Sequence, residues 1–137
     1  MLHLEIVTPE KKIFSDTVED VYLPGEDGEM GVLELHAALV SALKPGELRY
    51  KKDGKVEELA IGSGFAEVTT EKVSVLTDMA AGESDIDEEK VEAAMQRAEE
   101  ALANIEHSDD LEEIAHLQAT IAGSLAKLNL KRKRRQI

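Results

Sequence analysis

The sequence predicts an α+β protein in which an all-β N-terminal domain, a flattened antiparallel β-sandwich, is followed by a C-terminal two-helix antiparallel hairpin. Two observations carry this prediction. From Leu2 to about Asp78, short segments of alternating polar and apolar residues are separated by Gly, Pro and Asp, as in antiparallel strands and turns. From Ser84 onward the apolar residues recur at helical spacing, and Ala, Glu and Leu replace Val and Thr. We therefore expect two domains, residues 1–81 and 82–137.

The expected strands are short and each is bounded by a turn signal. The first covers residues 2–6, whose alternate residues share one face, and it ends before Pro9 because proline cannot donate to a strand ladder. Residues 25–28 supply the positive-φ positions of a tight hairpin, and residues 62–64 are interpreted as a strand bend. Further strands are expected around residues 13–14 and at residues 18–23, 47–51, 55–61, 65–69 and 73–77.

Two helices are expected in the second domain. Asp85 is the expected N-cap of the first helix, and Glu88 completes a capping box. Its apolar face consists of Val91, Met95, Ala98, Leu102 and Ile105. Asp109 and Glu112 form a second capping box for a helix with the apolar residues Leu111, Ile114, Leu117, Ile121, Leu125 and Leu128. Because the seam is rich in alanine, and Gly123 costs about 1 kcal/mol relative to alanine, we expect a hairpin that can open.

The composition disfavours several function classes. A net charge of −13 repels polyanions, so the expected partners are proteins and not nucleic acids. Without cysteine there is no disulfide, thiol nucleophile or thiolate metal site. No catalytic constellation is found, and the histidines lack the spacing of metal ligands: His3, His36, His107 and His116. We therefore expect no metal, no cofactor and no catalysis by the chain alone, and only peripheral contact with a membrane.

The C-terminal end is strongly basic. Six of the 16 basic residues lie in the last eleven positions and form what we call the basic arm: Lys127, Lys131, Arg132, Lys133, Arg134 and Arg135. The rest of the chain has ten basic residues against 29 acidic ones, a net charge of −19. Two interpretations remain open. The arm is either a solvated helix end that complements the macrodipole or a segment that docks on an acidic protein surface.

Five motifs occur in a characteristic order: LHLEIVTPE at residues 2–10, DGEMGVL at 27–33, LKPGEL at 43–48, GSGFAEV at 62–68 and VSVLTD at 73–78. In this order and spacing, the chain resembles the epsilon subunit family of F-type ATP synthases, called delta in mitochondria. The resemblance covers essentially the whole chain. It departs from the family pattern at residues 34–36, where Glu-Leu-His replaces the usual Pro-Gly-His, and at Ala38, which replaces a second proline.

The resemblance implies a non-catalytic rotor subunit in the central stalk of a bacterial proton-translocating ATP synthase. The sandwich would bind the gamma subunit and the ring of c subunits, through a loop containing Asp27, Gly28, Glu29, Met30, Gly31 and His36. The hairpin would extend along gamma, bring the basic arm to the alpha/beta catalytic head and inhibit hydrolysis. Since residues 1–10 show no targeting pattern, we expect a peripheral location on the cytoplasmic side of the bacterial inner membrane.

Some relatives bind ATP through an Ile/Leu-Asp-x-x-Arg-Ala motif at the start of the first helix. The corresponding residues here are Ile86, Asp87, Lys90 and Val91. Lysine lacks the planar fork of arginine and valine adds bulk, so we expect ATP binding that is weak or absent. Two other function classes remain: a nucleotide sensor that works on its own, and an unrelated β-sandwich scaffold or adhesion module with a helical oligomerisation tail.

Overall fold

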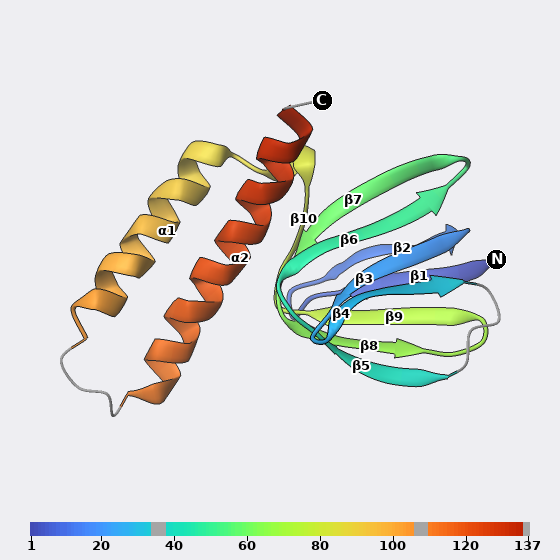
Figure 1. Ribbon diagram of the computed structural model, residues 1–137, viewed down its shortest axis with the longest axis horizontal. Coiled ribbons are helices and arrows are strands. Elements are labelled where there is room, and N and C mark those ends of the chain that lie inside the picture. Colours follow the sequence, from blue (N-terminus) through green and yellow to red (C-terminus); the bar gives the residue numbers. More distant parts are fainter. Residues whose placement is uncertain (34–37, 106–109, 136–137) are drawn as a thin grey trace.

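A computed structural model, which describes residues 1–33, 38–105 and 110–135, places a two-helix hairpin at one end of a β-sandwich (Figure 1). The strands are β1 (Leu2–Val7), β2 (Lys12–Val18), β3 (Asp20–Gly25), β4 (Gly28–Leu33), β5 (Leu39–Leu43), β6 (Gly46–Lys52), β7 (Lys55–Ile61), β8 (Gly64–Val68), β9 (Lys72–Thr77) and β10 (Ala80–Gly82). A 3-10 turn, η1 (Glu83–Asp85), leads to α1 (Glu88–Ala103) and α2 (Leu111–Arg135). The predicted fold class is confirmed.

The described strands form one sheet that folds back on itself. Its order is β10-β7-β6-β3-β5-β8-β9-β1-β2, with β4 paired to β3. The rings of Phe14 on β2 and Tyr50 on β6 lie 4.7 Å apart, and Lys52 on β6 donates to Asp16 on β2. The β2 edge therefore lies beside β6, which makes the sandwich nearly a barrel. One pair departs from the predicted antiparallel pattern: β1 and β9 are parallel, which the long intervening chain permits.

The core follows the predicted two-residue period. On β1 the side chains of Leu2, Leu4 and Ile6 are fully buried, whereas His3 and Glu5 are only half-buried. Each large aliphatic side chain buried in this way contributes about 1.5 to 3 kcal/mol. The other strands contribute further buried residues to the same core: Val18, Val21, Leu23, Val32, Leu43, Leu48, Ile61, Ala66, Val68, Val73 and Val75.

Four strand features differ from the sequence prediction, and one is β10, which occupies residues 80–82 where a domain boundary and no strand was expected. The segment at residues 18–23 is divided at Glu19, whose amide donates to the carbonyl oxygen of Lys51 at 2.7 Å. Strand β4 was not expected because Val32 is its single buried residue. Glycine is suited to position 31 there, since a Cβ would lie 3.0 Å from the Tyr22 ring on β3. Strand β5 was also not expected from the alternation.

The first helix begins two residues later than predicted. Asp87, and not Asp85, is its N-cap, and the Asp87 carboxylate accepts a hydrogen bond from the amide of Lys90 at 3.2 Å. Asp85 instead belongs to η1, which ends before the buried Ile86 and therefore delays the start of the helix. For α2, the predicted cap Asp109 lies outside the described residues. The Asp110 carboxylate accepts from the amide of Glu113 at 3.1 Å.

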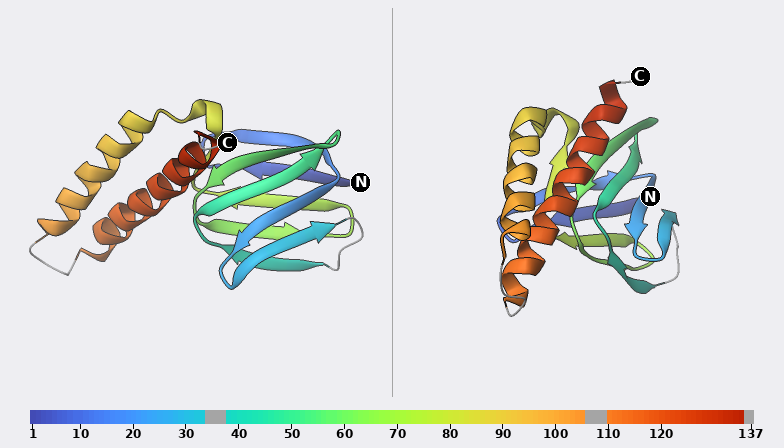
Figure 2. Two further views of the ribbon diagram at one scale, coloured as in Figure 1. Left: turned by 45° about the horizontal axis from the view of Figure 1, so that its top comes forward. Right: turned by 60° about the vertical axis from the view of Figure 1, so that its left-hand side comes forward.

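The buried face of α2 was only partly predicted. Leu128 is fully buried as expected, but Leu125 is 45% exposed and Leu111 is 71% exposed. Leu130, which was not expected on this face, is fully buried. The reason is that the C-terminal half of α2 packs against α1 on one side and against β6 and β7 on another (Figure 2). Burial against two neighbours selects a different face from burial against α1 alone.

Candidate partner-binding surfaces and the hairpin contact

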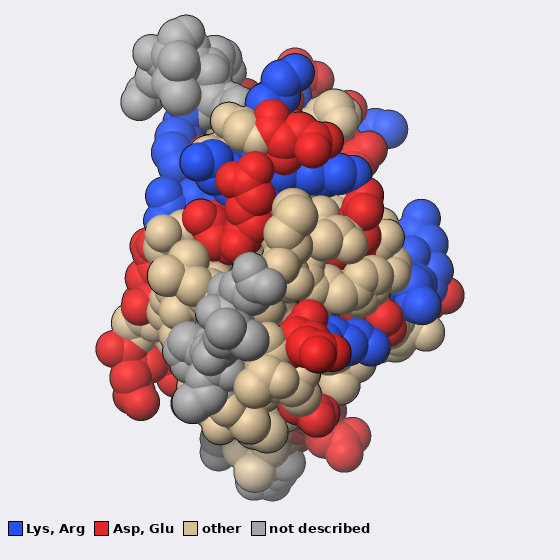
Figure 3. Space-filling view, turned by 90° about the vertical axis from the view of Figure 1, so that its right-hand side faces the viewer, with Lys and Arg blue, Asp and Glu red and all other residues tan. Residues whose placement is uncertain are grey.

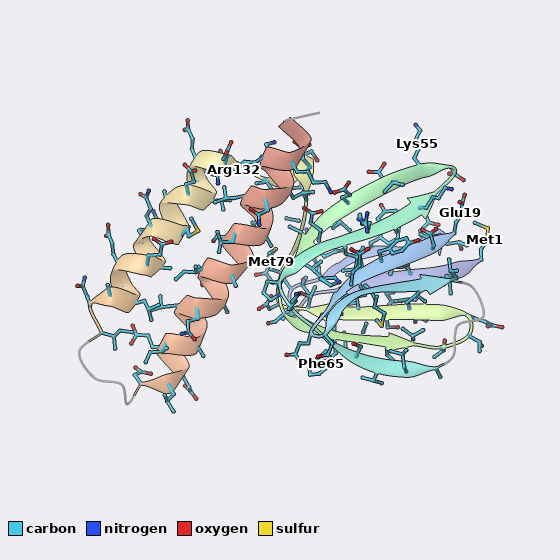
Figure 4. The ribbon with its side chains drawn as sticks, in the orientation of Figure 1. Met1, Glu19, Lys55, Phe65, Met79 and Arg132 are labelled. Carbon is cyan, nitrogen blue, oxygen red and sulfur yellow. The ribbon has the colours of Figure 1, made fainter. Side chains whose placement is uncertain are left out.

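The helical hairpin contacts the sandwich through a small apolar cluster, which we call the hairpin seat: Ala60 on β7, Ile86 after η1, and Ala126 and Leu130 on α2. Ala60 and Ala126 are small, so the helix and the sheet can approach closely. Beside the seat, Met79 lies between the sandwich and the helices (Figure 4). A Cβ at Gly123 of α2 would lie 3.4 Å from the Met79 Cε. The helix and the sandwich therefore lie within van der Waals distance of each other, but their contact contains few large side chains.

Lys133 in the basic arm contacts the sandwich directly. Its Nζ lies 3.1 Å from a carboxylate oxygen of Glu47 on β6 and 3.1 Å from one of Glu58 on β7. The hydrogen bonds that Glu58 and Glu47 accept raise the pKa of Lys133 above its ordinary value. Glu58 is the less exposed of the two carboxylates, at 13% of its side chain. The cation and both carboxylates thus form a bridge from α2 to two strands.

The two preceding residues of the basic arm contact other elements. Lys131 Nζ lies 3.1 Å from the Glu83 carboxylate in η1. Arg132 Nε donates to Glu88 on α1 at 2.9 Å, and its guanidinium also pairs with Glu92 one turn later. The Glu88 hydrogen bond, with the neighbouring charge of Glu92, raises the pKa of Arg132. Figure 4 shows Arg132 between α1 and α2.

Lys131 to Lys133 therefore contact acidic residues of this same chain, a surface that the sequence pattern did not identify. Lys127 instead lines a cavity between the helices and the sandwich, and no ion pair joins it within the described part of the chain. Arg134 and Arg135 belong to α2, but their side chains lie outside what the structure describes.

The cavity between the helices and the sandwich has a volume of about 530 Å³. Two of the four residues of the degenerate nucleotide motif line it, Lys90 and Val91. The other two have structural positions: Ile86 is buried in the hairpin seat and the Asp87 carboxylate caps α1. Polar groups from α2 complete one wall of the cavity: His116, Thr120, Ser124 and Lys127.

The predicted partner loop is largely a β-hairpin. Asp27 lies in the turn between β3 and β4, and Gly28, with a φ of +132°, begins β4. Glu29, Met30 and Gly31 continue along that strand. The strand places its last residue, Leu33, about 17 Å from its first, so the turn and the end of β4 lie at opposite ends of the sandwich. His36 lies outside the described residues.

An exposed apolar strip crosses the outer face of the sandwich. Ala42 on β5 lies opposite Phe65 on β8, and Phe65 lies opposite Leu76 on β9. Phe65 is 58% exposed and Leu76 is 55% exposed, and the exposed Val40 lies on the same face of β5. Figure 4 shows Phe65 at the edge of the sandwich, away from the core. Sequence reasoning missed this strip, although apolar residues on the outward phase of β8 and β9 were a usable signal.

The end of the sandwich opposite the helices is also partly apolar. In Figure 3, acidic and basic side chains lie interleaved above a broad area of uncharged residues. Met1 and Leu33, both exposed, lie at this end, and the segment after Leu33 joins β4 to β5. Among the residues that the structure describes, neither helix has the length and apolarity that a membrane span requires.

Family comparisons divide the chain between two domain descriptions. Residues 1–83 match the beta-sandwich domain of the ATP synthase delta/epsilon chain, and residues 84–132 match its long alpha-helix domain. The chain belongs to the ATP synthase delta/epsilon chain family. The predicted resemblance is therefore confirmed, and with it the assignment to the ATP synthase complex.

Curated relatives in this delta/epsilon family match nearly the whole chain. The ATP synthase epsilon chain of Nitratidesulfovibrio vulgaris is 42% identical over 95% of both chains. That of Herpetosiphon aurantiacus is 39% identical over 96% of this chain and 98% of its own. The fold resembles a chain of the Euglena gracilis mitochondrial ATP synthase, solved with OSCP, F1 and c-ring, with a TM-score of 0.71 and 26% identity. That match covers 91% of this chain and 78% of the Euglena chain.

Proposed function

We propose that this protein is the non-catalytic epsilon subunit in the central stalk of a bacterial F-type ATP synthase. The observation that best supports a role in transmitting rotation is the apolar strip on the sandwich. Phe65 and Leu76 expose large apolar side chains side by side in adjacent strands, and such a contiguous strip is suited to contact with a partner protein. The solved relative from Euglena comes from an assembly of F1 and c-ring. Rotation is transmitted through such contacts, and the chain contributes no catalytic group to it.

In this proposal the strip of Val40, Ala42, Phe65 and Leu76 contacts the gamma subunit. The end of the sandwich that lies away from the helices, with Met1 and Leu33, contacts the ring of c subunits. This chain would lie at the cytoplasmic side of the bacterial inner membrane, attached to it only through its protein partners.

Binding of the purified chain to its cognate gamma subunit tests this assignment. Replacing Phe65 or Leu76 by glutamate places a charge on the covered strip, so we expect sub-micromolar binding to weaken by at least about tenfold. Val56→Glu is the matched control, because Val56 is 54% exposed on β7 outside the strip. Equal binding by the Phe65, Leu76 and Val56 variants, measured by calorimetry, would refute the strip as the gamma contact.

The second part of the proposal concerns regulation by the hairpin. The hairpin seat holds few large side chains, which favours exchange between a docked form and an extended form along gamma. In the extended form the basic arm would reach acidic residues of the catalytic head and inhibit hydrolysis. Deleting residues 84–137 should then raise the hydrolysis rate of the reconstituted complex. An unchanged rate under all nucleotide conditions would refute the inhibitory role and leave the coupling role intact.

Nucleotide binding is the alternative that one observation favours, since two lysines and two hydroxyl groups line the cavity: Lys90, Lys127, Thr120 and Ser124. We propose that ATP binds there weakly or not at all, and that no cofactor is needed. Of the motif residues, Ile86 is committed to the hairpin seat and Val91 packs against it. Calorimetric titration of the isolated chain with ATP tests this proposal, and micromolar affinity would overturn it in favour of a nucleotide sensor.

A further inference from the structure

The basic arm and the glutamates around it form a set of ion pairs that we call the latch. It consists of Lys131, Arg132 and Lys133 with Glu83, Glu88, Glu92, Glu47 and Glu58. We propose that the latch is an internal competitor for the basic arm. The chain's own acidic surface holds these three cations against η1, α1 and the sandwich, and an acidic partner can bind them only after these ion pairs break.

The geometry of the latch supports a role in docking. Consecutive residues of an α-helix point about 100° apart, so three neighbouring cations face three directions. Lys131 contacts η1, Arg132 contacts α1 and Lys133 contacts β6 and β7. The end of α2 is thereby joined to the linker, to the first helix and to the sandwich at once. A partner surface has to take these same three cations away from their glutamates, so its binding to them and closure of the latch exclude each other.

Of the contacts in the latch, the bridge from Lys133 to the sandwich is the most important for docking of α2, because of how its charges are arranged. Glu47 and Glu58 lie diagonally across the β6–β7 pair, on the strand face that carries Ala60 and meets α2. Both carboxylates are less than a quarter exposed, at 24% and 13%. When α2 leaves, they lose the cation between them and repel each other. A single exposed ion pair contributes little to stability. Here, however, one cation interacts with two carboxylates that are both partly buried.

The absence of cysteine from the chain permits a direct measurement of opening. In an Ala126→Cys variant the thiol lies in the hairpin seat, where Ala126 is only 5% exposed. Its rate of modification by a thiol reagent therefore reports the fraction of molecules with α2 undocked. A Gln118→Cys variant, at an exposed position of the same helix, corrects for effects of salt on thiol reactivity.

In the Ala126→Cys background, Lys133→Gln should raise the corrected modification rate about two- to fivefold at low salt. Raising NaCl from about 0.05 to 1 M shortens the screening length from roughly 14 Å to 3 Å and should raise the corrected rate of the Ala126→Cys chain in which Lys133 is kept. Lys127→Gln is the matched control, because it removes the same charge from the same helix without breaking an ion pair among the described residues. Equal rates for the Lys133 and Lys127 variants, or a rate that salt does not change, would overturn the latch.

A regulatory role of the latch rests on the inhibitory function proposed above for the hairpin. A second measurement tests the latch and the inhibitory function separately. Glu58→Gln weakens the latch and leaves the basic arm intact, so it should raise the thiol rate and also strengthen inhibition of hydrolysis in the reconstituted complex. A raised thiol rate with unchanged hydrolysis would support the latch and refute the inhibitory role. An unchanged thiol rate for Glu58→Gln would contradict the latch itself, whatever the hydrolysis rate.

Discussion

Leu130 offers the clearest test of what holds the helical hairpin against the sandwich. Its side chain is fully buried in the hairpin seat, with Ala60, Ile86 and Ala126 as neighbours. Replacing a buried leucine by alanine costs about 2 to 5 kcal/mol, depending on how well the site can collapse. Two of these neighbours are alanines that cannot fill the space, but α2 can shift because its outer face lies in solvent. We therefore expect about 2 to 3 kcal/mol for Leu130→Ala.

A loss of this size lowers the ratio of docked to undocked hairpin by about 30- to 150-fold. The thiol at position 126 should be modified faster by the same factor, while the sandwich keeps its own unfolding transition. Leu125→Ala is the matched control, since Leu125 lies on the same helix and is 45% exposed. Its effect should stay below about 1 kcal/mol. If both leucine variants opened the hairpin equally, the seat would not be the source of docking energy.

Three further predictions concern single positions. Gly123→Ala should stabilise α2 by about 0.5 to 1 kcal/mol in thermal unfolding, since its Cβ would meet Met79 at an ordinary contact distance; a loss of stability would contradict this. Gly64→Ala should destabilise the sandwich by about 3 kcal/mol in urea, because its Cβ would lie 1.9 Å from a carbonyl oxygen of β9; an unchanged midpoint would refute the argument. The hydrogen bond from Lys52 lowers the pKa of Asp16 below its ordinary value of 3.8. The ionised carboxylate therefore stabilises the fold above pH 3.8, and this contribution is lost as the pH falls through the pKa of the folded state. The stability curves of the unsubstituted chain and Asp16→Asn should therefore converge on acidification, and a constant gap down to low pH would be inconsistent with this ion pair.

The strands that could be predicted from the sequence are those with a full alternation of burial. In β1, Leu2, Leu4 and Ile6 all enter the core, so the two-residue period is visible. In β4 only Val32 is buried and two of its six residues are glycines, so its pattern resembles a loop. Its pairing with β3 depends on hydrogen bonds between backbones, which side-chain patterning does not record.

The helical face and the candidate sites were harder to predict because they depend on contacts between distant segments. The predicted apolar stripe of α2 faced α1 alone, whereas the contact with the sheet also buries Leu130, and Leu125 stays partly exposed on another face. The basic arm was visible as a charge pattern. Its partners were not, since Lys133 is 86 residues from Glu47 and 75 from Glu58.

The parallel pairing of β1 with β9 also determines when the sandwich can form during synthesis. Leu4 lies beside Val73, so β1, the first strand to leave the ribosome, cannot complete its pairing until β9 has been synthesised. At about 5 to 20 residues per second, this delay is on the order of 4 to 14 seconds. The β1–β2 hairpin can form locally in that time, but one edge of β1 stays unpaired, and an unpaired apolar edge favours association with other chains. Closing the sandwich is thus a late, long-range step, and a nascent chain that stops before β9 keeps its first strand open.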